Sequence, residues 1–334
     1  MYAVVLVGGF GTRLRPLTYD IPKPMLPVVH RPMIVRLVER LAPAGLTDVV
    51  LALGFKPEPF AAAFPDGVHR LADGGTVRVH YAVEPEPLDT GGAIAFAARA
   101  VGIDSTFVVA NGDVMTDVAI CDLLAAHRDG GRAATIHLTP VADPSAFGVV
   151  ECGADGTVRR FVEKPAPGET ASNLINAGTY VFEPEVLDLI APGGAVSVER
   201  DTFPKLVAAG RLGSYATDDY WIDTGRPELY LAANLDLIDG TRNVSETAIE
   251  HDADISPSAL VEHSVVSSRA IVESDAQVRN SVLLPGARVG AGATVSDSIV
   301  AGHVGAAASL VGCVIGAGYS VAAGSELAAL RLPE

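Results

Sequence analysis

The stretch Leu6–Pro27, LVGGFGTRLRPLTYDIPKPMLP, begins inside a short β-branched run at the start of the chain. That run, Tyr2–Val7, is typical of a buried parallel strand. The glycine-rich turn after it has so few side chains that backbone amides can approach an anion closely. Three cations follow, and their donors suit a polyphosphate: Arg13, Arg15 and Lys23. The opening therefore predicts a strand that leads into a phosphate-binding loop.

Two better-known phosphate loops do not fit this stretch. A dinucleotide-binding fingerprint needs G-x-G-x-x-G, and the run that starts at Gly9 ends in Leu14 instead. A P-loop needs G-K-[ST], which the stretch lacks. An ordinary glycine-rich turn would leave the clustered cations unexplained.

The opening also resembles a known family. Gly8–Thr18 followed by Pro22–Pro27 is similar to the signature of the sugar-1-phosphate nucleotidylyltransferases, and most of all to that of the mannose-1-phosphate guanylyltransferases. The motif is long and specific, and the likeness continues through later motifs over nearly the whole chain. It implies transfer of a nucleotidyl group from a nucleoside triphosphate to a sugar 1-phosphate, with GTP and mannose 1-phosphate as the leading pair.

The composition agrees with a cytoplasmic enzyme. The chain has 334 residues, of which 49% are hydrophobic, enough for one large or two moderate domains. Its formal charge of −16 argues against a protein that binds nucleic acid or an anionic membrane, since either needs a basic face. No basic leader precedes the first strand, and no apolar run approaches the ~20 residues that span a bilayer. Three cysteines without metal-ligand spacing are interpreted as reduced structural thiols: Cys121, Cys152 and Cys313.

Up to about residue 240, segments typical of strands and helices alternate. Helical spacing runs from Pro32 to Ala44, and strands are predicted at 48–53 and 107–110. This order predicts βαβ units in a Rossmann-like α/β domain, with a mainly parallel mixed sheet and helices on both faces. Ligands bind at the carboxyl ends of the strands in such sheets, where the glycine loop and the turn at Asp113 would lie.

After Gly240 the pattern changes to a repeat. Apolar residues recur at steps of six among small ones, at 272 and 278, 289 and 295, 304 and 310, 321 and 327. A coarser repeat of Ser or Cys followed by two apolar residues starts at 264, 281, 298 and 313. The pattern predicts a parallel β-helix of hexapeptide repeats with about four to five coils, and the family resemblance implies a left-handed one. We thus expect a catalytic domain over residues 1–240 and a β-helix over residues 241–334.

The β-helix suggests a second function, because hexapeptide acyltransferases share it and often use a histidine base. His263 and His303 lie in repeat positions. The array is short, however, and no accessory sequence indicates a coenzyme pocket, so both are interpreted as surface or coil-corner residues. The repeat domain is assigned to packing, assembly or regulation, and its deletion is expected to change assembly or stability more than chemistry. A homo-oligomer built partly through it is implied by the resemblance.

The implied reaction is an in-line attack of a sugar phosphate oxygen on the α-phosphorus, with pyrophosphate as the leaving group. The nucleophile is already an anion at neutral pH, since the second pKa of a phosphate monoester lies near ~6, so no general base is needed. The protein must neutralise and align mutually repelling anions, with cations, backbone amides and carboxylates for Mg²⁺.

Residues that match the family's motifs receive roles by that resemblance. The nucleotide would be held by Leu6, Gly8, Gly9, Gly11, Thr12, Arg13, Glu84, Gly91, Asn111 and Asp113. The sugar phosphate would be held by Gly148, Glu163, Lys164, Asn176 and Asp223. Arg13, Lys23 and Lys164 would be catalytic, because they neutralise the triphosphate, the transition state and the attacking phosphate. Asp113 and Asp223 would hold Mg²⁺, which needs few protein carboxylates when substrate phosphates complete its coordination.

The choice of base depends on Glu84–Ala93, EPEPLDTGGA, which matches the segment that wraps the nucleobase and ribose in the family. A carboxylate such as Glu84 could accept from both the N1–H and the exocyclic amine of guanine, which favours GTP over thymine or uracil nucleotides. Asp89 stands where the guanylyltransferase pattern more usually has glycine.

Two alternatives stay open from the sequence. A thymidylyl-, uridylyl- or other guanylyltransferase that acts on glucose 1-phosphate, a heptose 1-phosphate or a cyclitol phosphate would share the mechanism. A catalytically silent regulatory homologue would be expected to lose at least one of five charged residues, all of which are present: Arg13, Lys23, Asp113, Lys164 and Asp223.

Overall fold

The computed structural model describes residues 1–9, 11–54, 57–242 and 245–334, and the chain divides into two compact units. Unit 1 comprises Met1–Gly9 and Ile34–Trp221, and unit 2 comprises Phe10–Met33 and Ile222–Glu334. Phe10, which belongs to the opening motif, lies outside the described residues. The predicted division of the chain at residue 240 stays a prediction.

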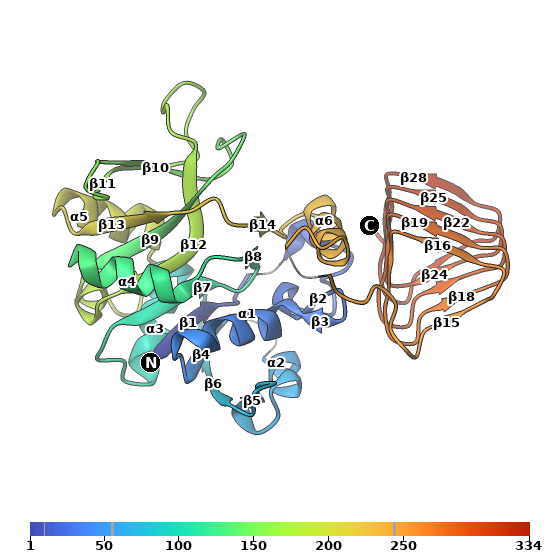
Figure 1. Cartoon of the computed structure of the whole chain (residues 1–334), viewed down its shortest axis with the longest axis horizontal. Coiled ribbons are helices and arrows are strands. Elements are labelled where there is room, and N and C mark those ends of the chain that lie inside the picture. The colour runs from blue at the N-terminus through green and yellow to red at the C-terminus, as the bar shows by residue number, and fades with distance from the viewer. Residues whose placement is uncertain (10, 55–56, 243–244) are drawn as a thin grey trace. The chain divides into compact units, whose positions relative to one another are not determined.

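Unit 1 is built on a mixed sheet whose centre is parallel (Figure 1). In spatial order the parallel strands are β7 (Phe107–Asn111), β1 (Tyr2–Leu6), β4 (Asp48–Leu53) and β6 (Thr76–Val83). The three strands predicted from the sequence are confirmed. All six residues of β4 are buried, as expected for a strand that is covered on both faces.

Antiparallel strands extend the sheet at both sides of this centre. They are β12 (Leu174–Phe182), β10 (Gly148–Cys152) and β11 (Val158–Glu163) on one side and β5 (Val68–Arg70) on the other. β9 (Ala134–Pro140) pairs antiparallel with β12 and parallel with β13 (Leu212–Ala216). Only the short stretch 153–157 joins β10 to β11, which is enough for a hairpin and too short for a parallel crossover.

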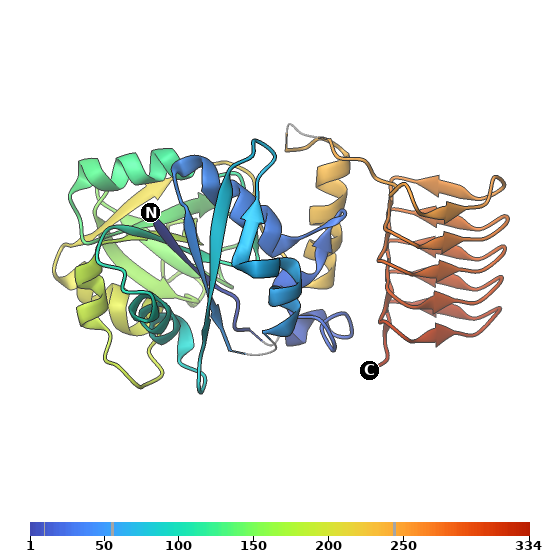
Figure 2. The same ribbon diagram turned by 90° about the horizontal axis from the view of Figure 1, so that it is seen from below.

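Helices cover both faces of this sheet, as predicted (Figure 2). In that view α1 (Met33–Leu41) and α4 (Ile120–Gly130) lie on one side, and α3 (Asp89–Ala100) and α5 (Phe203–Ala208) lie on the other. The helix predicted at 32–44 is α1 followed by a 3-10 turn, Ala42–Ala44, which ends at Gly45 with φ 77°. The shorter elements are α2 (Glu58–Ala63), β8 (Val114–Thr116), β14 (Trp221–Asp223), the 3-10 turns Pro65–Gly67 and Pro184–Leu189, and a π-helical turn, Val198–Thr202.

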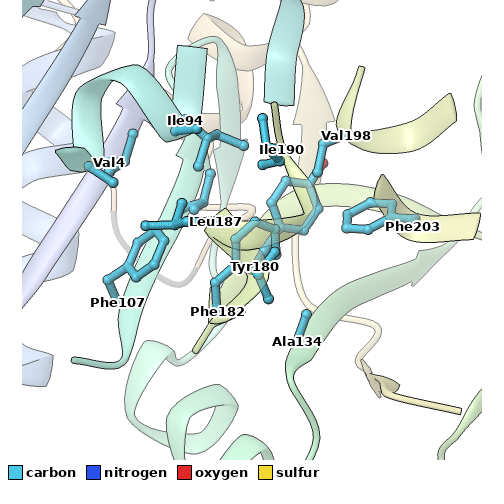
Figure 3. Packing of buried hydrophobic residues seen from close by; sticks show 14 of the residues in the cluster. Val4, Ile94, Phe107, Ala134, Tyr180, Phe182, Leu187, Ile190, Val198 and Phe203 are labelled. Atoms are coloured by element: carbon cyan, nitrogen blue, oxygen red, sulfur yellow. The ribbon is translucent and has the colours of Figure 1, made fainter. Parts of the chain in front are cut away.

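The core of unit 1 is aromatic around β12 (Figure 3). Tyr180 and Phe182 lie on the same face of the strand and stack, with ring centroids 5.7 Å apart. Phe182 also meets Phe107 and Phe203 edge to face, at 5.9 and 6.3 Å. Such pairs contribute about 0.5–1.5 kcal/mol each beyond the burial of their surface. The cluster therefore fixes β12, the strand that carries the predicted site residue Asn176.

A buried carboxylate lies at the start of β4. The carboxylate of Asp48 accepts two hydrogen bonds from Arg78, at 2.6 and 2.8 Å, and one from Thr47 at 2.8 Å. Its Oδ1 also lies 2.9 Å from His80 Nε2. The bond to Arg78 holds the pKa of Asp48 well below its ordinary value, although burial acts in the opposite direction.

We expect Asp48→Asn to lower the free energy of unfolding at pH 7 by about 2 kcal/mol, the scale of a hydrogen bond to a buried charge. Because the folded pKa is depressed, this contribution is present above about pH 4, where the unfolded carboxylate is ionised, and is lost as the pH falls further. Urea unfolding from pH 7 to pH 3 measures it. The difference in the free energy of unfolding between the wild type and Asp48→Asn should decrease below pH 4. A difference that does not change with pH would contradict this explanation.

Unit 2 joins two stretches that are distant in sequence. The first holds the 3-10 turns Thr12–Leu14 and Lys23–Met25 and the hairpin of β2 (Pro27–Val28) and β3 (Arg31–Pro32). Helix α6 (Pro227–Ile238) fastens this hairpin with two fully buried side chains. Asn234 Oδ1 accepts from Val29 N at 2.6 Å, and the Tyr230 hydroxyl donates to Pro27 O. The Asn234 bond supports Val29 in a left-handed conformation, φ 50°, that β-branched residues rarely adopt.

The remainder of unit 2 is a parallel β-helix of five coils, as predicted, with its coils stacked in register (Figure 2). Its three parallel sheets are β15 (Asp254–Ile255), β18 (Ile271–Val272), β21 (Arg288–Val289), β24 (His303–Val304) and β27 (Ser320–Val321); β16 (Leu260–Glu262), β19 (Gln277–Arg279), β22 (Thr294–Ser296), β25 (Ser309–Val311) and β28 (Glu326–Ala328); and β17 (Val265–Val266), β20 (Val282–Leu283), β23 (Ile299–Val300), β26 (Val314–Ile315) and β29 (Arg331–Leu332). The apolar residues at steps of six fill the interior, since Val272, Val278, Val289, Val295, Val304, Leu310 and Val321 are all buried. This is the arrangement expected of a left-handed hexapeptide β-helix.

The coarser repeat is explained by a ladder of buried hydroxyl groups. Ser264 Oγ accepts from Ser281 N, Ser281 Oγ accepts from Ser298 N, and Ser298 Oγ accepts from Cys313 N, at 3.0, 3.1 and 2.9 Å. Each hydroxyl also donates to the carbonyl two residues earlier. These buried polar groups are therefore paired from coil to coil, and the ladder ends where cysteine replaces serine. All three cysteines are free thiols, as interpreted.

Within the described ranges, no helix is both long enough and apolar enough to cross a membrane.

Candidate active site

The turn that carries Asp113 packs against the end of β1. Gly112 N donates to Leu6 O at 2.9 Å, and a Cβ on Gly112 would come within 2.7 Å of Val7 Cγ1. Only glycine fits there, so the Asn-Gly-Asp turn is a close packing of two strand ends. Asp113 follows in a half-buried position, at the carboxyl edge of the sheet where the sequence predicted it.

The glycine turn after β1 is open on one side and packed on the other. A Cβ on Gly8 would lie 3.3 Å from Gly54 N and 3.6 Å from Glu84 Oε1. A Cβ on Gly9 would meet no described atom within 4 Å. The backbone at Gly9 is therefore accessible, as a phosphate-binding loop requires.

Glu84 lies beside this turn with its orientation fixed. Its backbone N–H donates to Leu53 O at 2.8 Å, and its Oε2 accepts from Leu88 N at 3.0 Å. Burial raises the pKa of Glu84, and the bond from Leu88 opposes that shift. The predicted base-reading carboxylate thus lies next to the first glycine of the loop and turns one oxygen, Oε1, toward it.

Gly91 has a packing role that the sequence did not predict. Its N–H donates to Val196 O at 2.7 Å, and a Cβ would lie 3.0 Å from that oxygen. The first turn of α3 can therefore lie against the segment 194–198. The same contact is strengthened by Thr90, whose hydroxyl donates to Glu199 Oε2 at 2.7 Å and accepts from Val198 N at 2.9 Å.

The unusual Asp89 is explained by its backbone conformation. Its φ is 58°, in the left-handed region that favours glycine, which is the residue more usual at this position of the guanylyltransferase pattern. Aspartate tolerates this region better than most residues because its short side chain bonds locally, and Oδ1 accepts from Thr90 N at 2.7 Å. Oδ2 pairs with Arg200 Nη2 at 2.6 Å. The substitution therefore keeps the turn and adds an ion pair on top of it.

The predicted sugar-phosphate residues of the β10–β11 hairpin lie together. Gly148 pairs with Glu163 in the register, and a Cβ on Gly148 would lie 2.5 Å from Phe161 Cζ and 2.9 Å from Glu163 Oε2. Lys164 follows with φ 49°, and its N–H donates to Phe147 O at 3.0 Å. Its Nζ lies 3.6 Å from Glu163 Oε1, and 68% of its side chain is exposed, so it can reach an incoming anion.

Asn176 shapes a bulge in β12. Its Oδ1 accepts from Gly178 N and its Nδ2 donates to the Tyr180 hydroxyl, both at 2.9 Å. Gly178, with φ 77°, lets the bulge pass Asn111, whose Nδ2 would lie 2.7 Å from a Cβ on that glycine. Asn111 and Asn176, assigned from the sequence to the nucleotide and the sugar, are thus joined through one glycine.

Two further side chains border this site and were not predicted. Trp221 Nε1 donates to Ala177 O at 2.9 Å, and its ring meets Phe147 edge to face at 5.6 Å. A single tryptophan two residues before Asp223 was a signal that could have found it. Glu199, the partner of Thr90, carried no such signal, because its neighbours form an ordinary charged run.

Unit 2 brings together Lys23, Asp223 and Arg13. Lys23 is 5% exposed, and its Nζ lies 3.3 Å from Asp223 Oδ1, which also accepts from Gly225 N at 2.9 Å. Arg13 Nη2 would lie 3.3 Å from a Cβ on Gly225.

The loop that holds these cations is ordered by Gly11 and Thr18. Gly11 has φ 60°, and its carbonyl accepts from Thr18 Oγ1 at 2.7 Å. Thr12 and Arg13 are exposed, and the Arg15 guanidinium lies 5.4 Å from the centre of the Tyr19 ring. The loop therefore presents its arginine to solvent from a fixed backbone.

The carboxylates fit a hard cation that takes few protein ligands. No group of three or more His, Cys, Asp or Glu in the described part of the chain is arranged to hold a metal ion. Asp113 and Asp223 are each half-buried, and the bonds from Lys23 and Gly225 both fall on Oδ1 of Asp223. Mg²⁺ keeps waters and phosphate oxygens and typically takes one or two carboxylates, so these donors suit it.

The two repeat-domain histidines are exposed, as interpreted. His263 lies at a coil corner with φ 44°, 2.7 Å from Asn280 Oδ1 and 2.8 Å from Asp239 Oδ1. Its hydrogen bonds with Asn280 and Asp239 raise its pKa. The imidazole is thus engaged between a coil and the end of α6.

Comparison with known proteins assigns both parts of the chain. Residues 2–240 match the family model described as nucleotidyl transferase, and residues 239–327 match the GlmU-like C-terminal hexapeptide model. A mannose-1-phosphate guanylyltransferase of Mycobacterium tuberculosis is 40% identical over 303 residues, which are 88% of this chain and 82% of that protein. A mannose-1-phosphate guanyltransferase of Schizosaccharomyces pombe is 42% identical over 234 residues, 69% of this chain and 62% of the yeast protein.

Solved structures are similar over the first part of the chain. HddC from Yersinia pseudotuberculosis, crystallised with GMP-PN, is 30% identical with a TM-score of 0.58, over 70% of this chain and 97% of HddC. A putative glucose-1-phosphate thymidylyltransferase from Bacillus anthracis has a TM-score of 0.63 over 74% of this chain and 97% of its own. At 23% identity, that second likeness concerns the fold alone.

Proposed function

This chain belongs to the nucleotidyl transferase family, and from that membership we propose that it is a mannose-1-phosphate guanylyltransferase, which forms GDP-mannose and pyrophosphate from GTP and mannose 1-phosphate. The observation that carries the proposal is the 40% identity to a protein of that name over 88% of the chain. The oriented carboxylate of Glu84 beside Gly8 supports it, since such a group suits the two N–H donors of guanine.

The cations of the site would have different roles toward the triphosphate, the attacking phosphate and the transition state. Arg13 and Lys23 would neutralise the triphosphate, and Lys23 is already held in one place by Asp223 before any substrate arrives. Lys164 would draw the attacking phosphate into line, with Glu163 accepting from sugar hydroxyls. Fixed charges of this kind stabilise a transition state without the cost of reorganising water.

We propose Mg²⁺ as the cofactor, held by Asp113 and Asp223. When bound, it would neutralise charge on the phosphate oxygens. The backbone N–H groups of the glycine turn, accessible at Gly9, would face the same phosphates. Four expectations from the sequence stay predictions. They are a catalytic domain in residues 1–240, assembly through residues 241–334, a homo-oligomer and a cytoplasmic location.

The experiment that tests the proposal is pyrophosphate release with Mg²⁺ across GTP, dTTP, UTP, ATP and CTP, each against mannose, glucose and other sugar 1-phosphates. We expect kcat/KM for GTP with mannose 1-phosphate to exceed that of other pairs by at least about 100-fold, because a site built for two N–H donors rejects bases that lack them. Preference for another pair would support the nucleotidyl transfer reaction but would contradict GTP and mannose 1-phosphate as the substrates. If the folded protein releases no pyrophosphate with any pair, the result would favour a catalytically silent regulatory homologue.

A further inference from the structure

The end of the β-helix touches the loop that carries Arg13. We propose that Arg331 and Gly316, both in the β-helix, are positioning residues that hold this loop in its working conformation. The inference rests on the proposed function, in which Arg13 neutralises the triphosphate. The cation loop is defined here as residues 11–25.

The first contact is a hydrogen bond to the backbone of Arg13 itself. Arg331 Nη1 donates to Arg13 O at 2.9 Å. Arg331 lies in β29, which pairs with β26 through Val314 and Arg331. A charged donor makes this bond stronger than one between neutral groups. The β-helix therefore holds the residue whose guanidinium is assigned to the phosphates.

The second contact is a close packing of the same loop on a glycine. A Cβ on Gly316 would lie 2.8 Å from Pro16 Cβ and 3.0 Å from Pro16 Cγ, and Pro16 is buried. Gly316 N donates to Leu332 O at 2.7 Å, so it belongs to the same end of the β-helix as Arg331. Two independent contacts thus fall within four residues of the loop.

The chain that enters the β-helix holds the other side of this region. His30 Nε2 lies 2.9 Å from Thr247 O, and its Nδ1 lies 3.4 Å from Glu250 Oε2. Arg31 Nη2 donates to Glu246 Oε1 at 3.2 Å. The segment from Arg13 to Arg31 is therefore fastened at both of its ends by residues of the repeat region.

The bond between Thr18 and Gly11 orders the start of the loop, and the β-helix adds contacts at Arg13 and Pro16. Thr12–Leu14 is a single 3-10 turn, whose hydrogen bonds have poorer geometry than those of an α-helix, and Thr12 and Arg13 are exposed. A catalytic cation must lie within about 0.5 Å of its productive position. On this proposal the repeat domain affects nucleotide binding as well as assembly, through the loop that carries Arg13.

The test uses Arg331→Met in the full-length protein, which keeps the alkyl stem and removes the donor. Arg279→Met is the matched control, because Arg279 is exposed on the β-helix and pairs with Glu262 within it. Gly316→Ala disturbs the second contact. Its control is Gly290→Ala, since a Cβ on Gly290 would come within 2.7 Å of Ala306 N inside the β-helix.

We expect Arg331→Met to raise KM for the nucleoside triphosphate about tenfold, the effect of losing one hydrogen bond of about 1.4 kcal/mol. Gly316→Ala should raise the same KM, because the added methyl group displaces Pro16. KM for the sugar 1-phosphate should stay within twofold. Trypsin should cleave the ligand-free variants faster after Arg13. Arg279→Met and Gly290→Ala should leave both readouts unchanged, although Gly290→Ala lowers Tm.

Kinetic constants for Arg331→Met that match those of Arg279→Met, or equal effects of Gly316→Ala and Gly290→Ala, would overturn the proposal. An inactive wild-type protein would contradict the proposed function alone, because the rate of cleavage after Arg13 still reports on the loop.

Discussion

Asp113→Asn is expected to abolish Mg²⁺-dependent turnover, with kcat reduced on the order of 10³-fold or more, while the fold stays intact. Asparagine has the shape of aspartate and can occupy the same turn, which Gly112 holds against the end of β1. The substitution removes the negative charge and replaces one acceptor oxygen by a donor. Because a neutral amide would hold Mg²⁺ less tightly than the carboxylate does, the repelling phosphates would be less well neutralised, and the barrier would rise without a change in packing.

Initial rates across a Mg²⁺ titration, together with Tm, measure this effect. Asp104→Asn is the matched control, since Asp104 is an exposed aspartate on a different turn of the same unit. It should match the wild type in both readouts. A rate for Asp113→Asn equal to that of Asp104→Asn would remove Asp113 from the metal site.

Lys23→Met is expected to lower kcat on the order of 10²–10³-fold, the scale for the loss of one preorganised group that stabilises the transition state. It should also lower the free energy of unfolding by about 1–2 kcal/mol, because the half-buried carboxylate of Asp223 then loses its ion pair with Lys23. The side chain is buried between Pro22 and Pro24, so solvent cannot replace the ammonium. Lys205→Met, which removes an exposed lysine bonded to Leu189 O, should change neither quantity.

The double variant Lys23→Met/Asp223→Asn separates the two effects. Removing the unpaired carboxylate should restore stability to near the wild type, whereas turnover should stay at or below that of Lys23→Met. Urea unfolding and steady-state kinetics on the same preparations decide this. Recovery of activity together with stability would mean that Lys23 acts only by supporting the fold.

The fold could be predicted from the sequence where one local pattern decides it. The β-branched runs at 2–7 and 48–53 are buried parallel strands because their side chains suit a sheet covered on both faces. The steps of six after residue 240 place each apolar residue inside a coil of the β-helix. The antiparallel direction of β12 was not predicted, because it depends on pairing with β7, whose partner residues lie 69 or more positions away.

The sequence predicted which residues belong to the candidate site, but it did not predict the contacts between them. Lys23 and Asp223 are separated by 200 positions, so no local pattern could pair them. Gly91 was assigned to the nucleotide, yet its missing Cβ makes room for the protein itself, at Val196 O. Spacing alone does not distinguish these two uses of a glycine, since both need a missing Cβ.

The number of coils in the β-helix sets the distance between its two ends. From the bridge at Ile249 to Arg331, one sheet contains five strand spacings of ~4.8 Å, roughly 24 Å in all. Residues at its two ends meet the same short stretch of chain, at His30 and Arg31 on one side and at Arg13 on the other. Adding or removing one coil would displace the far contact by a full spacing, more than a hydrogen bond can span. The number of coils in the repeat domain is therefore matched to the segment from Arg13 to Arg31, and an insertion or deletion of one coil would require a compensating change in that segment.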